Sequence, residues 1–284
     1  MSAGGGGRTM RRSLLALAYF LASGVTLAFL ALPIVAIFVH VPPGRLIDQL
    51  SNPVVVDALI VSFKTTVIAQ ALVLLFGTPT AYLLASRRFP GRSLCVTLVE
   101  LPLVLPPAVA GIGLLVAFGR FGLLGGALSW FGITVPFTQA AVTVAVAFVA
   151  SPLYIRQAIA AFEAVDPNLV AASRTLGAGP ARTFFRVVLP LARGGLVAGA
   201  ALAFARGLGE FGATIMFAGS LQRVTQTLPL AIYAQFEVDF DVTLAISALL
   251  VLISAALLIS FKLTSLWQPS EQTSRSRFGL LSWS

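Results

Sequence analysis

The feature that most constrains the fold is a set of six long stretches that contain very few charged residues. Each stretch is long enough to cross the roughly 30 Å hydrocarbon core of a bilayer as a helix. They cover residues 14–39, 57–86, 93–118, 136–159, 194–217 and 242–266. Because a lipid-exposed backbone must satisfy its own hydrogen bonds, such segments favour helices. The sequence therefore predicts an all-α integral membrane protein with six transmembrane helices.

The composition agrees with this class. The chain is 58% hydrophobic and only 10% charged, whereas a soluble domain has about 25% charged residues. Its net charge of +9 could indicate nucleic-acid binding, but the arginines gather at membrane edges and do not alternate with aromatic residues. Membrane lipid is therefore the expected surrounding, and nucleic acid is not an expected partner. The single cysteine, Cys95, excludes a disulfide framework.

The distribution of Lys and Arg predicts the orientation. Fourteen of them lie in the segments on one side of the predicted spans and three on the other. The richer side is expected to face the cytoplasm. The prediction places both termini there, with a disordered glycine-rich segment 1–13, a membrane domain 14–266 and a polar tail 267–284.

The longest polar interruption is the stretch 166–190. Asp166 can accept hydrogen bonds from free amides at a helix start, and Pro167 fits the first helical position. Gly177 can adopt the positive φ that closes a helix. A second short helix is predicted to begin at Pro180.

That second helix should be interrupted by Pro190, because a proline lacks the amide hydrogen that the helix interior requires. The stretch 166–190 is therefore predicted to form a polar helix-turn-helix between two spans. Such a part is expected to be held by another protein.

The spacing within this stretch resembles the EAA motif, the cytoplasmic coupling loop of ABC importer permeases. The matching residues are Ala171, Ala172, Ser173, Gly177, Val187, Leu189 and Pro190. Three of them depart from the usual motif, in which Glu, Ala and Ile replace Ala171, Ser173 and Val187. The resemblance implies that these residues contact an ATPase subunit, with one polar contact missing at Ala171.

A wider resemblance covers about residues 53–266 and is closest to the permease subunit of molybdate importers. It rests on the segments 89–91, 101–107, 130–133, 174–179 and 204–215. Tungstate and sulfate/thiosulfate permeases are related, so sulfate remains the alternative substrate.

The resemblance also implies the partners and the location. It implies a homodimer of permease copies, two cytoplasmic ABC ATPase subunits and a periplasmic or lipid-anchored oxyanion-binding protein. These would assemble in the bacterial plasma (inner) membrane.

No catalytic motif is found in the sequence, and neither lysine belongs to a Walker A loop. The chain is therefore expected not to be an enzyme by itself. It should bind no metal or cofactor, and ATP with Mg²⁺ should bind the partner ATPase. Two alternative functions belong to other classes of protein, namely an ion-coupled secondary transporter and an intramembrane enzyme. The first would have no use for the polar loop, and the second would need a polar catalytic cluster.

Five residues are candidates for the translocation path. Pro106 and Pro107 are expected to kink the third span, either to line a pore or only for packing. Arg206 and Glu210 lie one turn apart within the predicted fifth span and can form a pair, which is either functional or purely structural. Lys64 either lines the path or extends to the interface.

The segment 207–212 matches G-x-G-x-x-G, but no strand precedes it, so a dinucleotide site is not expected. Its glycines, like Gly195 and Gly199, are instead expected to allow close helix packing.

Overall fold

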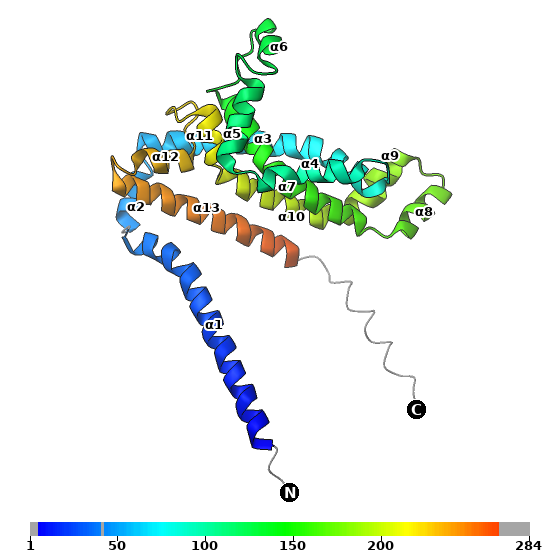
Figure 1. Cartoon of the computed structure of the whole chain (residues 1–284), viewed down its shortest axis with the longest axis horizontal. Coiled ribbons are helices and arrows are strands. Elements are labelled where there is room, and N and C mark those ends of the chain that lie inside the picture. The colour runs from blue at the N-terminus through cyan, green and yellow to red at the C-terminus, as the bar shows by residue number, and fades with distance from the viewer. Residues whose placement is uncertain (1–4, 41–42, 267–284) are drawn as a thin grey trace.

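The computed structural model describes residues 5–40 and 43–266, and within these ranges all regular structure is helical. Figure 1 shows an elongated bundle in which four long helices run side by side. These are α3 (Pro53–Ser86), α7 (Gln139–Glu163), α10 (Leu189–Leu208) and α13 (Phe240–Leu266). The predicted all-α membrane architecture is confirmed.

Five helices are long and apolar enough to cross a membrane, and a bent helix pair makes a sixth candidate. The first, second, fourth and sixth predicted spans are found within a few residues of the expected bounds. They correspond to Leu15–His40, Pro53–Ser86, Gln139–Glu163 and Phe240–Ser260. The third and fifth differ from the prediction.

The third span is broken rather than kinked. It consists of α4 (Arg92–Val104) and α5 (Pro107–Phe118), whose axes differ by 115°. Leu105 and Pro106 separate them in extended conformation, with ψ of 133° and 132°. Each of these two residues precedes a proline, and that position disfavours the helical region. Two such residues in succession end the helix.

The fifth span lies earlier in the sequence than predicted. A continuous helical segment runs from Pro180 to Leu208, through α9 (Pro180–Thr183), a π-helical turn over Phe184–Val188 and α10. The expected interruption at Pro190 is therefore wrong. In the π-helical turn the Leu189 amide donates to the Phe184 carbonyl, and such a local change in hydrogen bonding accommodates a proline within a helix.

The same segment ends sooner than expected. After Leu208 the chain leaves the helix at Gly209, and a separate helix, α11 (Gly212–Ala218), follows. Glycines at 207, 209 and 212 weaken a helix here. Hydropathy alone predicted a span to Phe217, because the stretch remains largely apolar across this break.

Helix α1 (Gly5–His40) begins inside the segment that was predicted to be disordered. Extending an existing helix needs no new nucleus, so residues 5–13 continue it. Figure 1 shows α1 running away from the bundle, and its span has no buried residue. Residues 1–4 and the predicted tail 267–284 lie outside the described residues.

Four shorter elements connect the long helices. They are α2 (Pro43–Gln49), α6 (Gly125–Trp130), α8 (Pro167–Thr175) and α12 (Leu228–Gln235).

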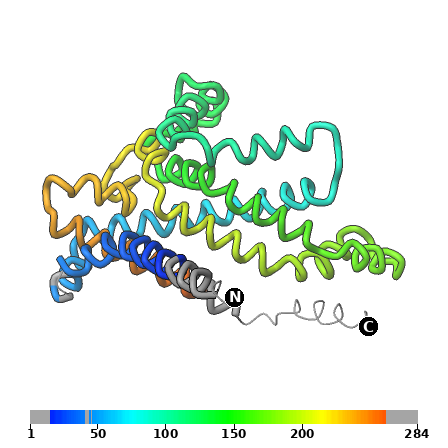
Figure 2. The backbone as a smooth tube through the Cα atoms, turned by 60° about the horizontal axis from the view of Figure 1, so that its bottom comes forward, coloured from blue at the N-terminus to red at the C-terminus, as the bar shows by residue number. Residues whose placement is uncertain are grey.

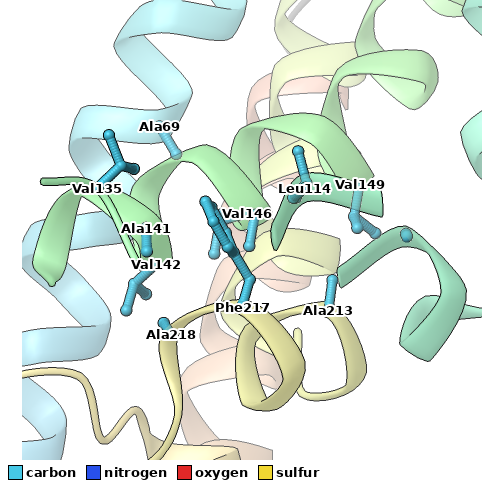
Figure 3. Close-up of a cluster of buried hydrophobic side chains, with 12 residues drawn as sticks. Ala69, Leu114, Val135, Ala141, Val142, Val146, Val149, Ala213, Phe217 and Ala218 are labelled. Atoms are coloured by element: carbon cyan, nitrogen blue, oxygen red, sulfur yellow. The ribbon is translucent and has the colours of Figure 1, made fainter. Parts of the chain in front are cut away.

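The buried core is built around α7. Figure 3 shows one cluster in which Phe217 of α11 points among side chains of α3, α5 and α7. A second cluster joins α7 to α3 and α10, and a third joins the start of α3 to α12 and α13.

Glycines bring α10 close to α7. A Cβ added at Gly195, Gly199 or Gly207 would lie 2.5, 2.8 or 2.8 Å from a side-chain atom of α7. The prediction of close packing at these glycines is confirmed.

Candidate functional site

The first candidate site is the 166–190 loop, which lies at one end of the bundle (Figure 2). Its local structure follows the sequence signals. The Asp166 carboxylate accepts a hydrogen bond of 2.8 Å from the amide of Asn168, and Pro167 begins α8. Gly177 has a φ of +81°, so it takes the left-handed conformation that closes this helix.

Helix α8 lies at the surface, and none of its residues is buried. Ala171 and Ala172 are exposed. The apolar side chains of Leu169 and Leu176 are 48% and 88% exposed. An exposed helix that carries apolar residues beside a turn leaves a surface on which another protein can pack.

The second half of the loop is more firmly built into the bundle. Val187 and Leu189 are half-buried and Pro190 is exposed. The Ser173 hydroxyl of α8 lies 3.1 Å from the Thr183 hydroxyl of α9, and Thr183 is buried. This contact fixes α8 against the start of the long helix, so the two halves of the motif form one unit.

The second candidate site is the break between α10 and α11. Nη1 of Arg206 lies 2.6 Å from Oε2 of Glu210. The other carboxylate oxygen of Glu210 accepts a hydrogen bond of 2.7 Å from the amide of Ala213. The pair was predicted inside a span, but it stands across a helix end, where Glu210 ties the last turn of α10 to the first turn of α11.

The two broken helices meet at this point. A Cβ added at Gly212 would lie 2.6 Å from Cβ of Pro107, and one added at Gly111 would lie 2.5 Å from the carbonyl oxygen of Ala213. The start of α5 therefore packs directly on α11. Pro106 and Pro107 are themselves exposed. The structure thus brings Pro107 and Glu210 into one region through α11.

Lys64 does not join this region. It is exposed on α3, outside the buried face of that helix, and within the described residues it has no ion-pair partner. Asp57, which lies two turns earlier, accepts instead from Gln222 at 3.1 Å and Arg223 at 3.2 Å. These bonds link α3 to the segment between α11 and α12, a contact that sequence reasoning missed because the partners are far apart in the chain.

Two further ion pairs were missed for the same reason. Arg92 lies 2.8 Å from Glu163, and Arg156 lies 3.2 Å from Glu100. Both join α4 to α7. Since α4 has no buried residue, these pairs are notable contacts that hold it beside the bundle.

No group of three or more His, Cys, Asp or Glu side chains within residues 5–40 and 43–266 is arranged to hold a metal ion. The first site thus consists of an exposed helix, α8, and the second of a helix break joined by the ion pair between Arg206 and Glu210.

Comparison with known sequences identifies a family. The sequence pattern of the family described as "Binding-protein-dependent transport system inner membrane component" matches residues 74–267. The molybdenum transport system permease protein ModB of Mycobacterium tuberculosis is 45% identical over 82% of this chain and 88% of its own length. ModB of Escherichia coli K12 is 43% identical over 78% and 96%.

A sulfate relative is somewhat less similar. The sulfate transport system permease protein CysT of Salmonella typhimurium is 37% identical over 82% of this chain and 80% of its own.

Solved structures agree on the fold. A chain of a bacterial ABC transporter involved in import of the acidic polysaccharide alginate superimposes with a TM-score of 0.66 at 16% identity, covering 91% of this chain and 97% of that one. A chain of the MetNI methionine ABC transporter in inward-facing conformation gives 0.58 at 21% identity, covering 75% and 94%.

Proposed function

Because the chain belongs to the family of binding-protein-dependent transport system inner membrane components, we propose that it is the membrane-spanning subunit of an ATP-driven molybdate importer. The observation that carries this proposal is the extensive similarity to molybdenum permeases over most of both chains. Tungstate is expected as a second substrate, because its size and charge are nearly those of molybdate.

In this proposal the chain performs no chemistry of its own. Two cytoplasmic ATPase subunits bind and hydrolyse ATP with Mg²⁺, and a periplasmic or lipid-anchored protein delivers the oxyanion to two permease copies. The exposed helix α8 docks on the ATPase, through Ala171, Ala172 and the turn at Gly177. Both termini lie in the cytoplasm, which the excess of Lys and Arg on that side supports.

The proposed path runs beside the helix breaks. Interrupted helices are found at membrane depth where they face protein or a water-filled cavity. Arg206 is 36% exposed on its side chain, whereas Glu210 is 1% exposed. The cation can therefore meet a passing anion while the carboxylate stays hidden behind it. A single accessible guanidinium attracts a dianion without holding it tightly, which suits a route rather than a storage site.

Sulfate is the alternative substrate, supported by the sulfate permease relative. An ion-coupled secondary carrier is disfavoured, because it would need no surface for an ATPase.

The test is transport into vesicles that contain the reconstituted permease, ATPase and binding protein. We expect ATP-dependent uptake of labelled molybdate that unlabelled tungstate competes with strongly and sulfate weakly. Uptake of sulfate without molybdate would overturn the substrate but keep the class. Uptake that runs on an ion gradient without ATP would overturn the class.

A further inference from the structure

A cavity of about 1210 Å³ lies behind α8. Five parts of the chain contribute to its walls, namely the ends of α3 and α7, the start of α4, helix α8 and the π-helical turn. Its charged lining consists of Arg88, Arg92, Glu163 and Arg174, and the hydroxyl-bearing residues of its lining are Tyr82, Ser86 and Ser93. Pro167 and Ala171 of α8 also line it, so the cavity is continuous with the exposed face of that helix.

One of the three arginines is already engaged. Nε of Arg92 donates to the Leu84 carbonyl at 2.7 Å, and its Nη2 lies 2.8 Å from the Glu163 carboxylate. Both bonds fix the start of α4 against the ends of α3 and α7. Arg92 and Glu163 therefore neutralise each other and serve the fold.

The other two arginines have no such role. Arg88 and Arg174 make no hydrogen bond or ion pair within residues 5–40 and 43–266, and they line the same cavity although they are far apart in the sequence. The cavity thus carries two uncompensated positive charges. Part of its wall is apolar and includes Phe162 and Val188, and a partly apolar wall strengthens the attraction for an anion.

We propose that this basic cavity receives an acidic side chain of the ATPase subunit. The planar guanidinium groups of Arg88 and Arg174 match a carboxylate in charge and geometry. The assignment to the ATPase rests on the proposed function, in which α8 docks on that subunit. Because Ala171 belongs both to α8 and to the cavity wall, a subunit that packs on α8 reaches the cavity without a second interface.

The first experiment measures binding of the purified ATPase subunit to the full-length permease in detergent. Arg88→Gln with Arg174→Gln removes both free charges from the cavity. Arg87→Gln with Arg193→Gln is the matched control, because it removes two charges from exposed residues on the same side that do not line the cavity. We expect the cavity variant to bind about tenfold more weakly or worse, and the control to stay near wild type.

The second experiment identifies the group in the cavity. Lys64 and Lys262 are the only lysines of the chain, so Arg174→Lys and Arg88→Lys, made as two separate variants, each introduce one new amine at the cavity. A zero-length carbodiimide cross-linker should join this amine to an Asp or Glu of the ATPase, and peptide mass spectrometry would locate the bond. The wild-type complex is the control for the two native lysines.

The outcomes distinguish a failure of the cavity proposal from a failure of the proposed importer function. If Arg88→Gln with Arg174→Gln binds the ATPase as the control does, or if Arg174→Lys and Arg88→Lys give no cross-link in an assembled complex, the cavity assignment is wrong. If the variant with Arg88→Gln and Arg174→Gln lost ATPase binding only in phosphatidylglycerol vesicles and not in detergent, the cavity would belong to a lipid headgroup instead. If inorganic phosphate alone competed with the ATPase for the wild-type permease, the cavity would belong to a free oxyanion. If the wild-type permease binds no ATPase, the proposed function itself fails.

Discussion

Nη1 of Arg206 lies 2.6 Å from Oε2 of Glu210 across the end of α10, and the two side chains differ sharply in exposure. The Arg206 side chain is 36% exposed and that of Glu210 is 1% exposed. Glu210 also accepts from the amide of Ala213. The carboxylate is therefore a buried link between two helices, while the guanidinium is its partly hydrated counter-ion.

This asymmetry predicts unequal effects of removing each charge. Arg206→Gln leaves a buried carboxylate without its cation, which costs about 3–5 kcal/mol. Glu210→Gln is expected to be milder, because its amide oxygen can still accept from Ala213 and water can solvate Arg206. Thermal unfolding of the detergent-solubilised permease should rank wild type first, Glu210→Gln second and Arg206→Gln last.

The double variant tests whether the two residues act as a pair. Arg206→Gln with Glu210→Gln should recover part of the stability lost in Arg206→Gln alone. Additive losses in this cycle would show that the two side chains act independently.

The ion pair between Arg156 and Glu100 is expected to contribute little to stability, in contrast to the pair between Arg206 and Glu210. Its side chains are 59% and 41% exposed at a distance of 3.2 Å. Exposed pairs of this kind contribute about 0–1 kcal/mol. Glu100→Gln should therefore leave the unfolding temperature close to wild type, and a loss as large as that of Arg206→Gln would contradict this assignment.

Gly177 provides a test of the proposed coupling loop. An added Cβ would meet no atom within 4 Å, so a substitution acts only through the backbone φ of +81°. A residue with a side chain pays about 1 kcal/mol or more there. That penalty is too small to unfold the bundle but large enough to reorient α8. Gly177→Val should insert normally and bind its ATPase weakly, and the loaded binding protein should no longer stimulate ATP hydrolysis.

Gly177→Asn is the matched control, because asparagine tolerates the left-handed conformation better than other side chains. It should stay near wild type in copurification of the ATPase. If Gly177→Val copurified the ATPase and transported at wild-type levels, α8 would not be the coupling element.

The packing of α10 on α7 can be tested with a compensating pair. A Cβ at Gly195 would lie 2.5 Å from Cβ of Ala161. Gly195→Ala should therefore lower stability by about 1–3 kcal/mol through overpacking. Ala161→Gly in the same chain removes the opposing atom and should restore the melting temperature. A stable Gly195→Ala single variant would indicate that the two helices separate freely.

Local signals in the sequence predicted a large part of this structure. Runs of apolar residues located α3, α7 and α13, because span length depends on the bilayer and not on tertiary contacts. The cap at Asp166 and the positive φ at Gly177 were also predictable, since both follow from the chemistry of single residues.

Contacts between distant residues were not predictable in this way. Arg92 and Glu163 are 71 positions apart, and no local pattern pairs them. The proline pair after Leu105 indicated a bend, but its size of 115° accompanies the packing of α5 on α11 through Gly111 and Ala213. The free arginines of the basic cavity likewise become visible only when α3 and α8 are placed together.

The π-helical turn at Phe184–Val188 has a mechanical consequence. Because this turn accommodates Pro190 without interrupting the helix, the 29 residues from Pro180 to Leu208 form one continuous rod of about 43 Å. One end of this rod is tied to α8 through Thr183, and the other adjoins Glu210. A pivot of about 5° near its middle would move each tip by about 2 Å in opposite directions. A rotation of this rod would therefore link a movement of α8 to a movement at the break between α10 and α11.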